Sequence, residues 1–232
     1  MKITHPEKRL KKFWGLVDQK NIKSISRNLA GNNILDMGCG LGTTTEYITK
    51  IGHYNCIGID YDSDAIEYCK RTYPQCNFQI ANAEQLPFED DYFDTIVLRD
   101  VLHHFYREAD FNKVTKEILR VSKSNARIIF FDPNVNFILK TLRRMSFHTD
   151  AECNYETAVE IMKQMGCKII HHDFNIVYSL PLSGGYVGIN FIPNVRYVQN
   201  VILFTEDYCE KLINKIGLGR QLCWRYLIVG QK

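Results

Sequence analysis

Residues 34–42 combine an acidic side chain with three alternating glycines, directly after a short apolar run. Asp36 is followed by Gly38, Gly40 and Gly42. Glycine lets the backbone approach a ligand closely and permits turns that a side chain forbids. A glycine-rich turn between a strand and a helix is a common cradle for nucleotide-like ligands in α/β proteins. The alternative interpretation is a glycine-rich turn that holds no ligand.

The type and spacing of these residues indicate which charged groups the ligand carries. A dinucleotide fingerprint places its third glycine three residues after the second, where this chain has Thr43. The carboxylate of Asp36 would repel a pyrophosphate, but it suits a ligand that carries an ammonium or sulfonium group. A nicotinamide-dependent oxidoreductase is therefore an alternative enzyme class, and both Thr43 and Asp36 count against it.

A second carboxylate follows about 20 residues beyond the glycines, which is where nucleoside-binding α/β folds place an acidic residue on the ribose hydroxyls. This is Asp60, at the end of the apolar segment 55–60. A carboxylate can accept two charge-assisted hydrogen bonds from a cis-diol. The alternative is that Asp60 only caps a helix that begins near Ser63. Asp62 and Ser63 already offer caps, so we expect Asp60 to bind the ligand.

Three further stretches follow in the order and at the spacing of a known family. An expected strand at 77–80 leads into Ala-Asn-Ala-Glu-Gln-Leu-Pro-Phe at residues 81–88, and an apolar strand at 92–98 comes next. Together with the glycine turn and Asp60, they resemble the class I S-adenosylmethionine-dependent methyltransferases of the small-molecule type. The resemblance extends over residues 33–131.

The resemblance implies contacts to the methyl donor. The side chain of Asn82 and the backbone amide of Ala83 would meet the adenine edge. Asn82 stands where the family commonly has aspartate, and its amide oxygen still accepts a hydrogen bond from the adenine amino group. The residues expected to bind the cofactor are Asp36, Gly38, Gly40, Gly42, Asp60, Tyr61, Asn82, Ala83 and Arg99.

Two adjacent histidines follow the fourth expected strand, in the sequence Leu102-His103-His104. The family often carries Leu-x-His or Leu-His-His at this place, and His104 aligns best with the usual histidine, with His103 second. A histidine there could accept a proton from an acceptor hydroxyl or amine. The alternative is a histidine that hydrogen-bonds to backbone and forms part of the pocket wall.

The resemblance implies a Rossmann-like α/β fold with a seven-stranded, mostly parallel sheet, an antiparallel edge strand and helices on both faces. We expect one methyltransferase domain over residues 1–232. Its parts are an N-terminal helical segment at 1–30, a cofactor-binding core at 31–131, and a C-terminal part at 132–232 with acceptor-site or lid insertions. The apolar segment 224–229 is expected to form the edge strand.

Composition excludes several classes of protein. An apolar content of 45% supports a sizeable core, and a net charge of +3 gives no case for nucleic-acid binding. The eight cysteines include no C-x-x-C pair, so no metal site is expected. No apolar run approaches the ~20 residues of a membrane-spanning helix. Residues 1–12 are charged throughout and do not resemble a signal peptide, so we expect a cytoplasmic protein with reduced thiols.

Acceptor specificity is expected to lie beyond Asp132. Residues 136–145 place basic side chains beside apolar ones, which fits a helix packed on the domain, a helix over an acidic substrate, or peripheral contact with a membrane. Residues 178–204 form an aromatic, glycine-dotted stretch that is longer than an ordinary connection. Long insertions of this kind are often functional lids. A helix is expected at 205–216.

The motifs predict transfer of a methyl group from S-adenosylmethionine to a small-molecule, lipid or glycan-pathway acceptor, with S-adenosylhomocysteine as product. The Asp/Asn-Pro-Pro-Tyr/Phe motif of amino-methylating nucleic-acid enzymes is missing after the fourth expected strand, and no Pro-Cys occurs. The nonenzymatic alternative is a cofactor-binding regulatory subunit without catalysis. The methylated atom, which could be oxygen, nitrogen or carbon, and the oligomeric state are left open by these motifs.

Overall fold

A computed structural model describes residues 13–135, 153–179 and 192–232 of the chain. Two compact units are distinguished within it. Of the described residues, the larger unit comprises 25–132, 153–172 and 227–232, and the smaller unit comprises 13–24, 133–135, 173–179 and 192–226. The expected basic helix at 136–145 and part of the expected lid, 180–191, lie outside the described residues.

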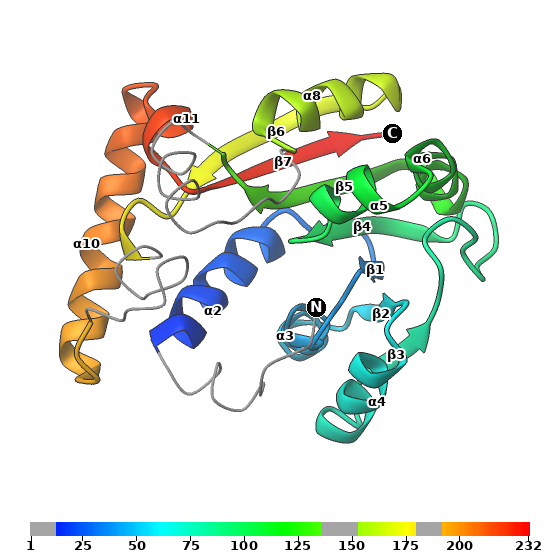
Figure 1. Cartoon of the computed structure of the whole chain (residues 1–232), viewed down its shortest axis with the longest axis horizontal. Coiled ribbons are helices and arrows are strands. Elements are labelled where there is room, and N and C mark those ends of the chain that lie inside the picture. The colour runs from blue at the N-terminus through cyan, green and yellow to red at the C-terminus, as the bar shows by residue number, and fades with distance from the viewer. Residues whose placement is uncertain (1–12, 136–152, 180–191) are drawn as a thin grey trace. The chain divides into compact units, whose positions relative to one another are not determined.

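Strands and helices alternate along most of the chain (Figure 1). The strands are β1 (Asn33–Met37), β2 (Asn55–Asp60), β3 (Asn77–Ile80), β4 (Phe93–Arg99), β5 (Ser122–Pro133), β6 (Lys168–Asn175) and β7 (Arg225–Gln231). The helices are α2 (Phe13–Ser26), α3 (Thr43–Ile51), α4 (Ser63–Thr72), α5 (Leu102–Glu108), α6 (Phe111–Val121), α8 (Tyr155–Gln164), α10 (Arg196–Lys215) and α11 (Gly219–Leu222). This alternation is typical of an α/β fold.

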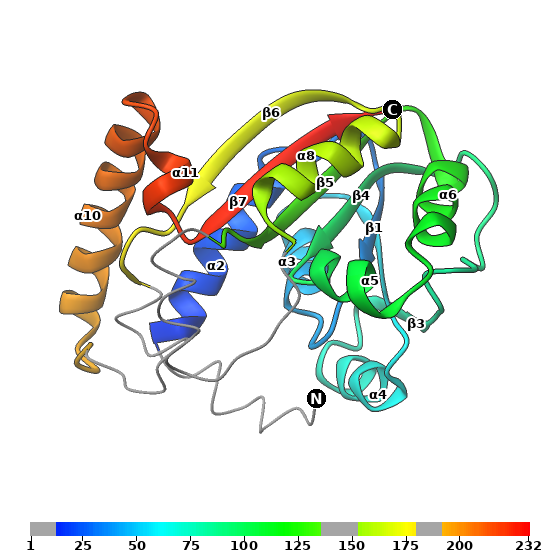
Figure 2. The same ribbon diagram turned by 45° about the horizontal axis from the view of Figure 1, so that its top comes forward.

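The seven strands form one sheet in the order β3-β2-β1-β4-β5-β7-β6. Strand β1 pairs in parallel with β2 and β4, β2 pairs in parallel with β3, and β4 pairs in parallel with β5. The Rossmann-like, mostly parallel sheet is thereby confirmed. Because these five strands are parallel, their carboxyl ends lie along one edge of the sheet, where open α/β sheets bind ligands. Helices α3, α4 and α5 follow the ends of β1, β2 and β4 (Figure 2).

The expected place of the last strand in the sheet was wrong. Strand β7 lies between β5 and β6, and β6 is the edge strand. Figure 1 shows β7 running opposite to both neighbours. The burial of the two strands explains the order. Six consecutive residues of β7 are buried, as in an interior strand, whereas the first six residues of β6 are exposed or half-buried.

Both faces of the central strands are buried in the larger unit. One face contributes Ile34, Cys56, Val97 and Ile129 to a core cluster that also contains Ile48 of α3. The alternate positions along the same strands are buried as well, and they include Leu35, Ile57, Ile96 and Ile128. Burial on both faces is typical of a parallel sheet that is covered by helices.

The smaller unit has a core of its own. Phe13 and Val17 of α2 pack in a cluster with Ile176, Ile192 and Trp224, and Ile202 and Leu203 of α10 are partly buried against it. The expected helical nature of the N-terminal segment is confirmed for α2. The side-chain amide of Asn134 donates hydrogen bonds to the carbonyl oxygens of Arg220 (2.8 Å) and Cys223 (2.8 Å).

Helix α10 corrects a second expectation. It begins at Arg196, so residues 196–204 belong to a helix and not to the long connection that was expected over 178–204. The N-terminal half of α10 is apolar on more than one face, and the preceding Val195 gives no capping side chain. Both features weaken the sequence signals that mark a helix start. Among the described residues, no helix combines the length and the apolar character needed to cross a membrane.

One lysine holds three carboxylates inside the smaller unit. The ammonium nitrogen of Lys20 lies 3.4 Å from Glu206, 2.7 Å from Asp207 and 2.7 Å from Glu210. Burial alone would lower the pKa of Lys20, but Glu210 and Glu206 raise it to about 12. Burial raises the pKa of Glu210 to about 7, against the lowering effect of Lys20. The cluster therefore ties α2 to α10. Lys20, Glu206 and Glu210 have little access to water, whereas the side chain of Asp207 is 57% exposed.

The same carboxylates fix the backbone that leaves β6. Glu206, whose side chain is fully buried, accepts hydrogen bonds from the backbone amides of Val177 (3.2 Å), Tyr178 (3.0 Å) and Ser179 (2.7 Å). Glu210 accepts one from the amide of Ile176 (2.6 Å). Ile176 adopts a left-handed backbone conformation with φ of 62°, which is unfavourable for a β-branched residue. The two glutamates supply the interactions that hold this turn.

Candidate active site

The glycine turn after β1 uses its three glycines for two different purposes. All three have positive φ angles, between 51° and 76°. A Cβ on Gly38 would lie 2.5 Å from a methyl carbon of Val101, and one on Gly42 would lie 2.8 Å from the sulfur of Cys69. A Cβ on Gly40 would meet nothing within 4 Å. Packing therefore requires Gly38 and Gly42, whereas Gly40 borders open space that a ligand can fill.

This difference predicts different effects of alanine at the three positions. We expect Gly38→Ala and Gly42→Ala to destabilise the fold by about 1–3 kcal/mol, because the new methyl group overpacks its neighbours. Gly40→Ala should cost only about 1 kcal/mol of backbone strain, but it should weaken binding of S-adenosylmethionine. Urea unfolding and calorimetric titration measure the two effects. Equal losses of stability at Gly38 and Gly40 would contradict the assignment.

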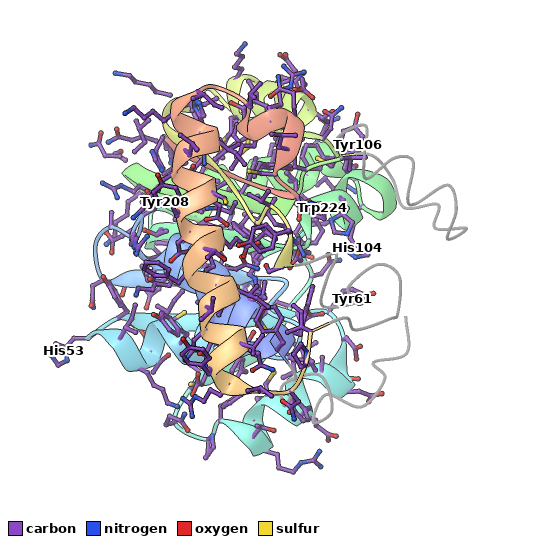
Figure 3. All side chains as sticks on the ribbon, turned by 90° about the vertical axis from the view of Figure 1, so that its left-hand side faces the viewer. His53, Tyr61, His104, Tyr106, Tyr208 and Trp224 are labelled. Atoms are coloured by element: carbon purple, nitrogen blue, oxygen red, sulfur yellow. The ribbon has the colours of Figure 1, made fainter. Side chains whose placement is uncertain are left out.

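Asp60 at the end of β2 is held against the turn by backbone amides. One carboxylate oxygen accepts from the amide of Gly40 (2.8 Å), and the other accepts from the amide of Asp62 (3.0 Å). Asp62, and not Asp60, is the N-cap of α4, since its side chain accepts from the amides of Asp64 and Ala65. Each oxygen of Asp60 keeps a second lone pair, which suits a pair of ribose hydroxyls. The adjacent Tyr61 side chain is exposed (Figure 3).

We expect Asp60→Ala to weaken binding of S-adenosylmethionine by at least ~1 kcal/mol, because hydrogen bonds to a charged acceptor would be lost. Asp62→Ala is the matched control, since it removes a neighbouring carboxylate that only caps a helix. It should cost about 1 kcal/mol of stability and leave the affinity unchanged. Calorimetric titration of both variants gives the comparison. If Asp60→Ala bound as tightly as the unmodified chain, Asp60 would have no part in the site.

Asp36 lies beneath the turn and is almost fully buried. Its carboxylate accepts a hydrogen bond of 2.6 Å from the hydroxyl of Thr45. Burial raises the pKa of Asp36 to about 6, while Thr45 and the charge of Arg99 act in the opposite direction. Arg99, at the end of β4, donates to the hydroxyls of Thr44 (3.0 Å) and Thr43 (3.4 Å) at the start of α3. Asp36 and Arg99 thus place one negative and one positive side chain next to the elements that flank the glycine turn.

Asn82 and Ala83 follow β3 at the same edge of the sheet. The amide of Ala81 bonds to the carbonyl oxygen of Asp60 (3.0 Å), which fixes the start of this loop beside β2. The side-chain oxygen of Asn82 accepts from the amide of Glu84 (2.9 Å), so it also supports the local turn. Asn82 is exposed and Ala83 is half-buried. The oxygen has a second lone pair for an adenine amino group.

The two histidines at the start of α5 differ in their surroundings. Nδ1 of His103 lies 3.0 Å from a carboxylate oxygen of Asp132, and the same oxygen accepts from the backbone amide of His103 (3.1 Å). The side chain of Asp132 is fully buried at the end of β5. His104 is exposed (Figure 3), with its ring centre 4.3 Å from that of His103. The carboxylate of Asp132 orients the imidazole of His103.

Strand pairing brings Asp132 to His103. Strands β4 and β5 are parallel, with Arg99 opposite Phe131, so the residues that follow both positions meet at the carboxyl edge. If Nδ1 donates its proton to Asp132, the basic lone pair of the imidazole lies on Nε2. From the sequence, Asp132 was identified only as the residue beyond which acceptor specificity is expected to lie. An acidic residue at the end of a strand next to the histidine-bearing strand is the signal that would have pointed to it.

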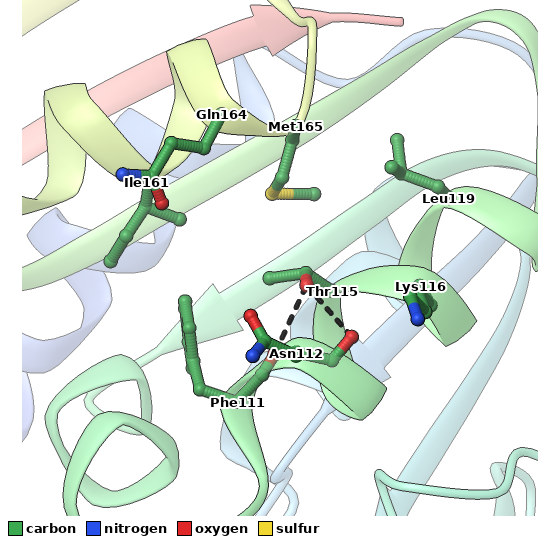
Figure 4. Close-up of a pocket in the computed structure, with 8 residues that line it drawn as sticks. All are labelled: Phe111, Asn112, Thr115, Lys116, Leu119, Ile161, Gln164 and Met165. Atoms are coloured by element: carbon green, nitrogen blue, oxygen red, sulfur yellow. Dashed lines mark hydrogen bonds between the residues drawn. The ribbon is translucent and has the colours of Figure 1, made fainter.

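A pocket of about 310 Å³ lies elsewhere in the larger unit, between α6 and α8. Its walls include Phe111, Leu119, Ile161 and Met165, and Lys116 is the charged side chain among the lining residues (Figure 4). None of the residues expected to bind the cofactor lines it. The lining residues include neither a carboxylate nor a histidine, so the pocket does not compete with the sheet edge as the candidate active site.

The sequence match to a known family covers most of the residues that form this edge, and Asp132 lies just beyond it. Residues 35–130 match the family described as a methyltransferase domain. Over these residues the chain is similar to the class I S-adenosylmethionine-dependent methyltransferases. This match supports S-adenosylmethionine as the methyl donor. The open space at Gly40 and the backbone-held carboxylate of Asp60 fit a nucleoside ligand. The family match removes the nicotinamide-dependent alternative.

Relatives of the methyltransferase domain include bacterial and plant proteins. The chain is 33% identical to the uncharacterized methyltransferase YcgJ of Bacillus subtilis over 112 residues, which cover 44% of this chain and 41% of that protein. It is 32% identical to phthiotriol/phenolphthiotriol dimycocerosates methyltransferase 1 of Mycobacterium ulcerans over 107 residues, covering 45% and 38%. The chain thus spans less than half the length of either relative.

A solved structure shows the same fold. The S-adenosylmethionine-dependent methyltransferase from Archaeoglobus fulgidus superposes with a TM-score of 0.64 over 94% of this chain and 94% of that chain. The two sequences are 20% identical over this alignment. At this level of identity the likeness shows the shared fold, and it confirms the Rossmann-like architecture that the sequence predicted.

Proposed function

We propose that the chain transfers the methyl group of S-adenosylmethionine to an oxygen or nitrogen atom of a small-molecule or lipid acceptor. The observation that carries this proposal is the pairing of His103 with the buried carboxylate of Asp132 at the carboxyl edge of the sheet. An oxygen or nitrogen acceptor carries a proton that must be lost, and an oriented imidazole is suited to take it. A carbon acceptor would have less use for this arrangement.

The chemistry divides between the donor and the chain. S-adenosylmethionine supplies a methyl group on a sulfonium, and the electron pair of the broken carbon–sulfur bond stays on the sulfur of S-adenosylhomocysteine. Nε2 of His103 takes the proton of the acceptor as the new bond to carbon forms, and Asp132 stabilises the imidazolium. The proton then passes to water. Positioning of the two reactants can supply about 7–11 kcal/mol of the barrier reduction, so a base adds to an effect that is already large.

The names of the relatives support the class of acceptor. The Mycobacterium ulcerans relative is named as a methyltransferase of phthiotriol and phenolphthiotriol dimycocerosates. A further relative, from Arabidopsis thaliana, is named as a tocopherol O-methyltransferase. Acceptors of this general kind are consistent with the proposal that His103 removes a proton from a hydroxyl group.

Labelled methyl donor tests the proposal. The full chain is incubated with S-adenosylmethionine that carries a tritiated methyl group, together with either an aqueous or a lipid extract of the source organism. We expect labelled product in one extract and none with chain that has been heat-denatured. A calorimetric titration runs in parallel. Absence of S-adenosylmethionine binding would overturn the proposal, and binding without label transfer to either extract would favour the regulatory subunit.

A further inference from the structure

Helix α10 presents a stripe of large apolar side chains on its exposed face. Tyr197, Val201, Phe204, Tyr208 and Leu212 each keep between 44% and 77% of their surface exposed. Their spacing of three and four residues places them on one side of the helix, where they form a continuous stripe. Figure 3 looks onto this helix, with Tyr208 labelled. Single exposed apolar residues are common on protein surfaces, but a contiguous row of this kind marks an interaction site.

The stripe is not the face by which α10 packs in the smaller unit. The buried residues of the helix are Gln199, Glu206 and Glu210, and they lie on the opposite side from the stripe. The amide of Gln199 donates to the carbonyl oxygen of Pro193 (3.2 Å), and the two glutamates bond to the turn after β6. The packing needs of the helix are therefore met without the stripe.

The carboxylates and the cations of α10 also differ in their surroundings. All three carboxylates of the helix, those of Glu206, Asp207 and Glu210, lie within 3.4 Å of the ammonium nitrogen of Lys20. The cations of the helix are exposed, and among the described residues they form no ion pairs; they are Arg196, Lys211 and Lys215. The exposed side of α10 thus offers apolar and cationic groups. Of its carboxylates, Glu206 and Glu210 are buried against Lys20, and Asp207, which also pairs with Lys20, is 57% exposed.

We propose that the exposed face of α10 docks on an anionic lipid surface. An amphipathic helix with aromatic and aliphatic residues on one face and lysine or arginine beside them lies in the plane of a bilayer interface. The tyrosine rings suit the headgroup level, Phe204 and Leu212 suit the acyl boundary, and the three cations attract anionic headgroups. This docking goes beyond the proposed methyl transfer and does not depend on it, since binding to lipid requires neither cofactor nor acceptor.

A second copy of the chain fits this face less well. Two α10 helices packed in parallel would set Lys211 and Lys215 against the same lysines of the other copy, and like charges in contact oppose association. An antiparallel pair centred on the stripe would place these lysines against Val201 and Tyr197, with no carboxylate to pair them. Burying cations without partners is costly. An anionic lipid surface satisfies both the apolar stripe and the cations.

Co-sedimentation with vesicles tests the docking. The full chain is mixed with vesicles of phosphatidylcholine alone or with vesicles of phosphatidylcholine and phosphatidylglycerol in equal parts. We expect at least about tenfold stronger binding to the anionic vesicles, weakening as salt is added. The double variant Phe204→Ser/Tyr208→Ser should lose about tenfold or more of this binding, because apolar groups no longer enter the interface. Lys211→Gln/Lys215→Gln should lose most of the preference for anionic lipid.

A matched pair of single variants controls for surface apolarity in general. Leu212 is 48% exposed on the stripe, and Ile51 is 46% exposed at the end of α3. Leu212→Ser should weaken vesicle binding severalfold, whereas Ile51→Ser should leave it unchanged, and both should keep the urea midpoint of the unmodified chain. The proposal is overturned if the chain does not sediment with anionic vesicles, or if the stripe variants bind like the unmodified chain. It is also overturned if Phe204→Ser/Tyr208→Ser dissociates a dimer in analytical ultracentrifugation, because a second copy would then cover the stripe.

Discussion

Replacing His103 by alanine is expected to lower the rate of methyl transfer by about 10²–10⁴-fold, the usual contribution of a general base. The buried carboxylate of Asp132 holds the imidazole through Nδ1, so the loss of the ring removes the proton acceptor without touching the glycine turn. The affinity for S-adenosylmethionine should stay the same. Transfer of a tritiated methyl group measures the rate, and calorimetry measures the affinity.

Two further variants distinguish a histidine that acts as general base from a histidine that only lines the pocket. His104→Ala removes the neighbouring exposed ring and should change the rate little, because Asp132 orients the imidazole of His103. Asp132→Asn keeps the shape of the carboxylate, but it removes the charge that stabilises the imidazolium, so the rate should fall and its dependence on pH should shift. If His103→Ala and His104→Ala lowered the rate equally, the assignment of the base to His103 would be wrong.

Replacing Lys20 by methionine is expected to destabilise the fold by about 3–5 kcal/mol at pH 7, because breaking a buried ion pair leaves uncompensated charge. The methionine fills a similar volume, so the effect reports the charge. Glu206 and Glu210 would lose the cation that lies within 3.4 Å of both. Urea unfolding of the full chain measures the change, and Lys70→Met, at an exposed position on α4, is the control.

The pH dependence of this effect follows from Glu210. Its folded pKa of about 7 lies above the ordinary value of 4.5, so the folded chain holds a proton more tightly than the unfolded chain. Its contribution is favourable at low pH and is lost as the pH rises from about 4.5 through 7. The penalty of Lys20→Met should therefore shrink at pH 5, where Glu210 can be neutral. A penalty below 1 kcal/mol at pH 7 would show that the three carboxylates do not need the lysine.

The sequence was sufficient where the determinants of structure lie close together along the chain. The turn from β1 into α3 is encoded by glycines within five residues, and Asp60 is marked by its place at the end of the next strand. The strands expected at 55–60, 77–80 and 92–98 also follow from local hydrophobic patterns, and the structure has β2, β3 and β4 close to these residues. The parallel order of β1 to β5 follows once the family resemblance is stated.

The features that could not be predicted from the sequence depend on residues that lie far apart along the chain. The choice between His103 and His104 depends on Asp132, which lies 29 residues further along the chain and arrives through the pairing of β4 with β5. The interior position of β7 depends on pairing with strands far away in the chain. The start of α10 was missed because its apolar residues serve two surfaces, so they do not show a single helical stripe.

The buried carboxylate of Asp36, under the glycine turn, is expected to couple binding of the methyl donor to release of a proton. Asp36 has its pKa raised to about 6, mainly by burial, so the folded chain keeps a proton that the unfolded chain has lost between about pH 4 and 6, and stability falls as pH rises through this range. A cation bound beside the carboxylate favours its charged form. Near pH 6 we therefore expect S-adenosylmethionine to expel a proton on binding.

Calorimetry in two buffers of different ionisation enthalpy detects this exchange. The apparent binding enthalpy should differ between the buffers for the unmodified chain, and it should be the same in both for Asp36→Asn, which has no proton to release. Identical enthalpies for the unmodified chain would mean that the cation does not sense Asp36. If the enthalpies differ, the proton and the methyl donor compete as ligands of one internal carboxylate, and acidification acts as an inhibitor of cofactor loading.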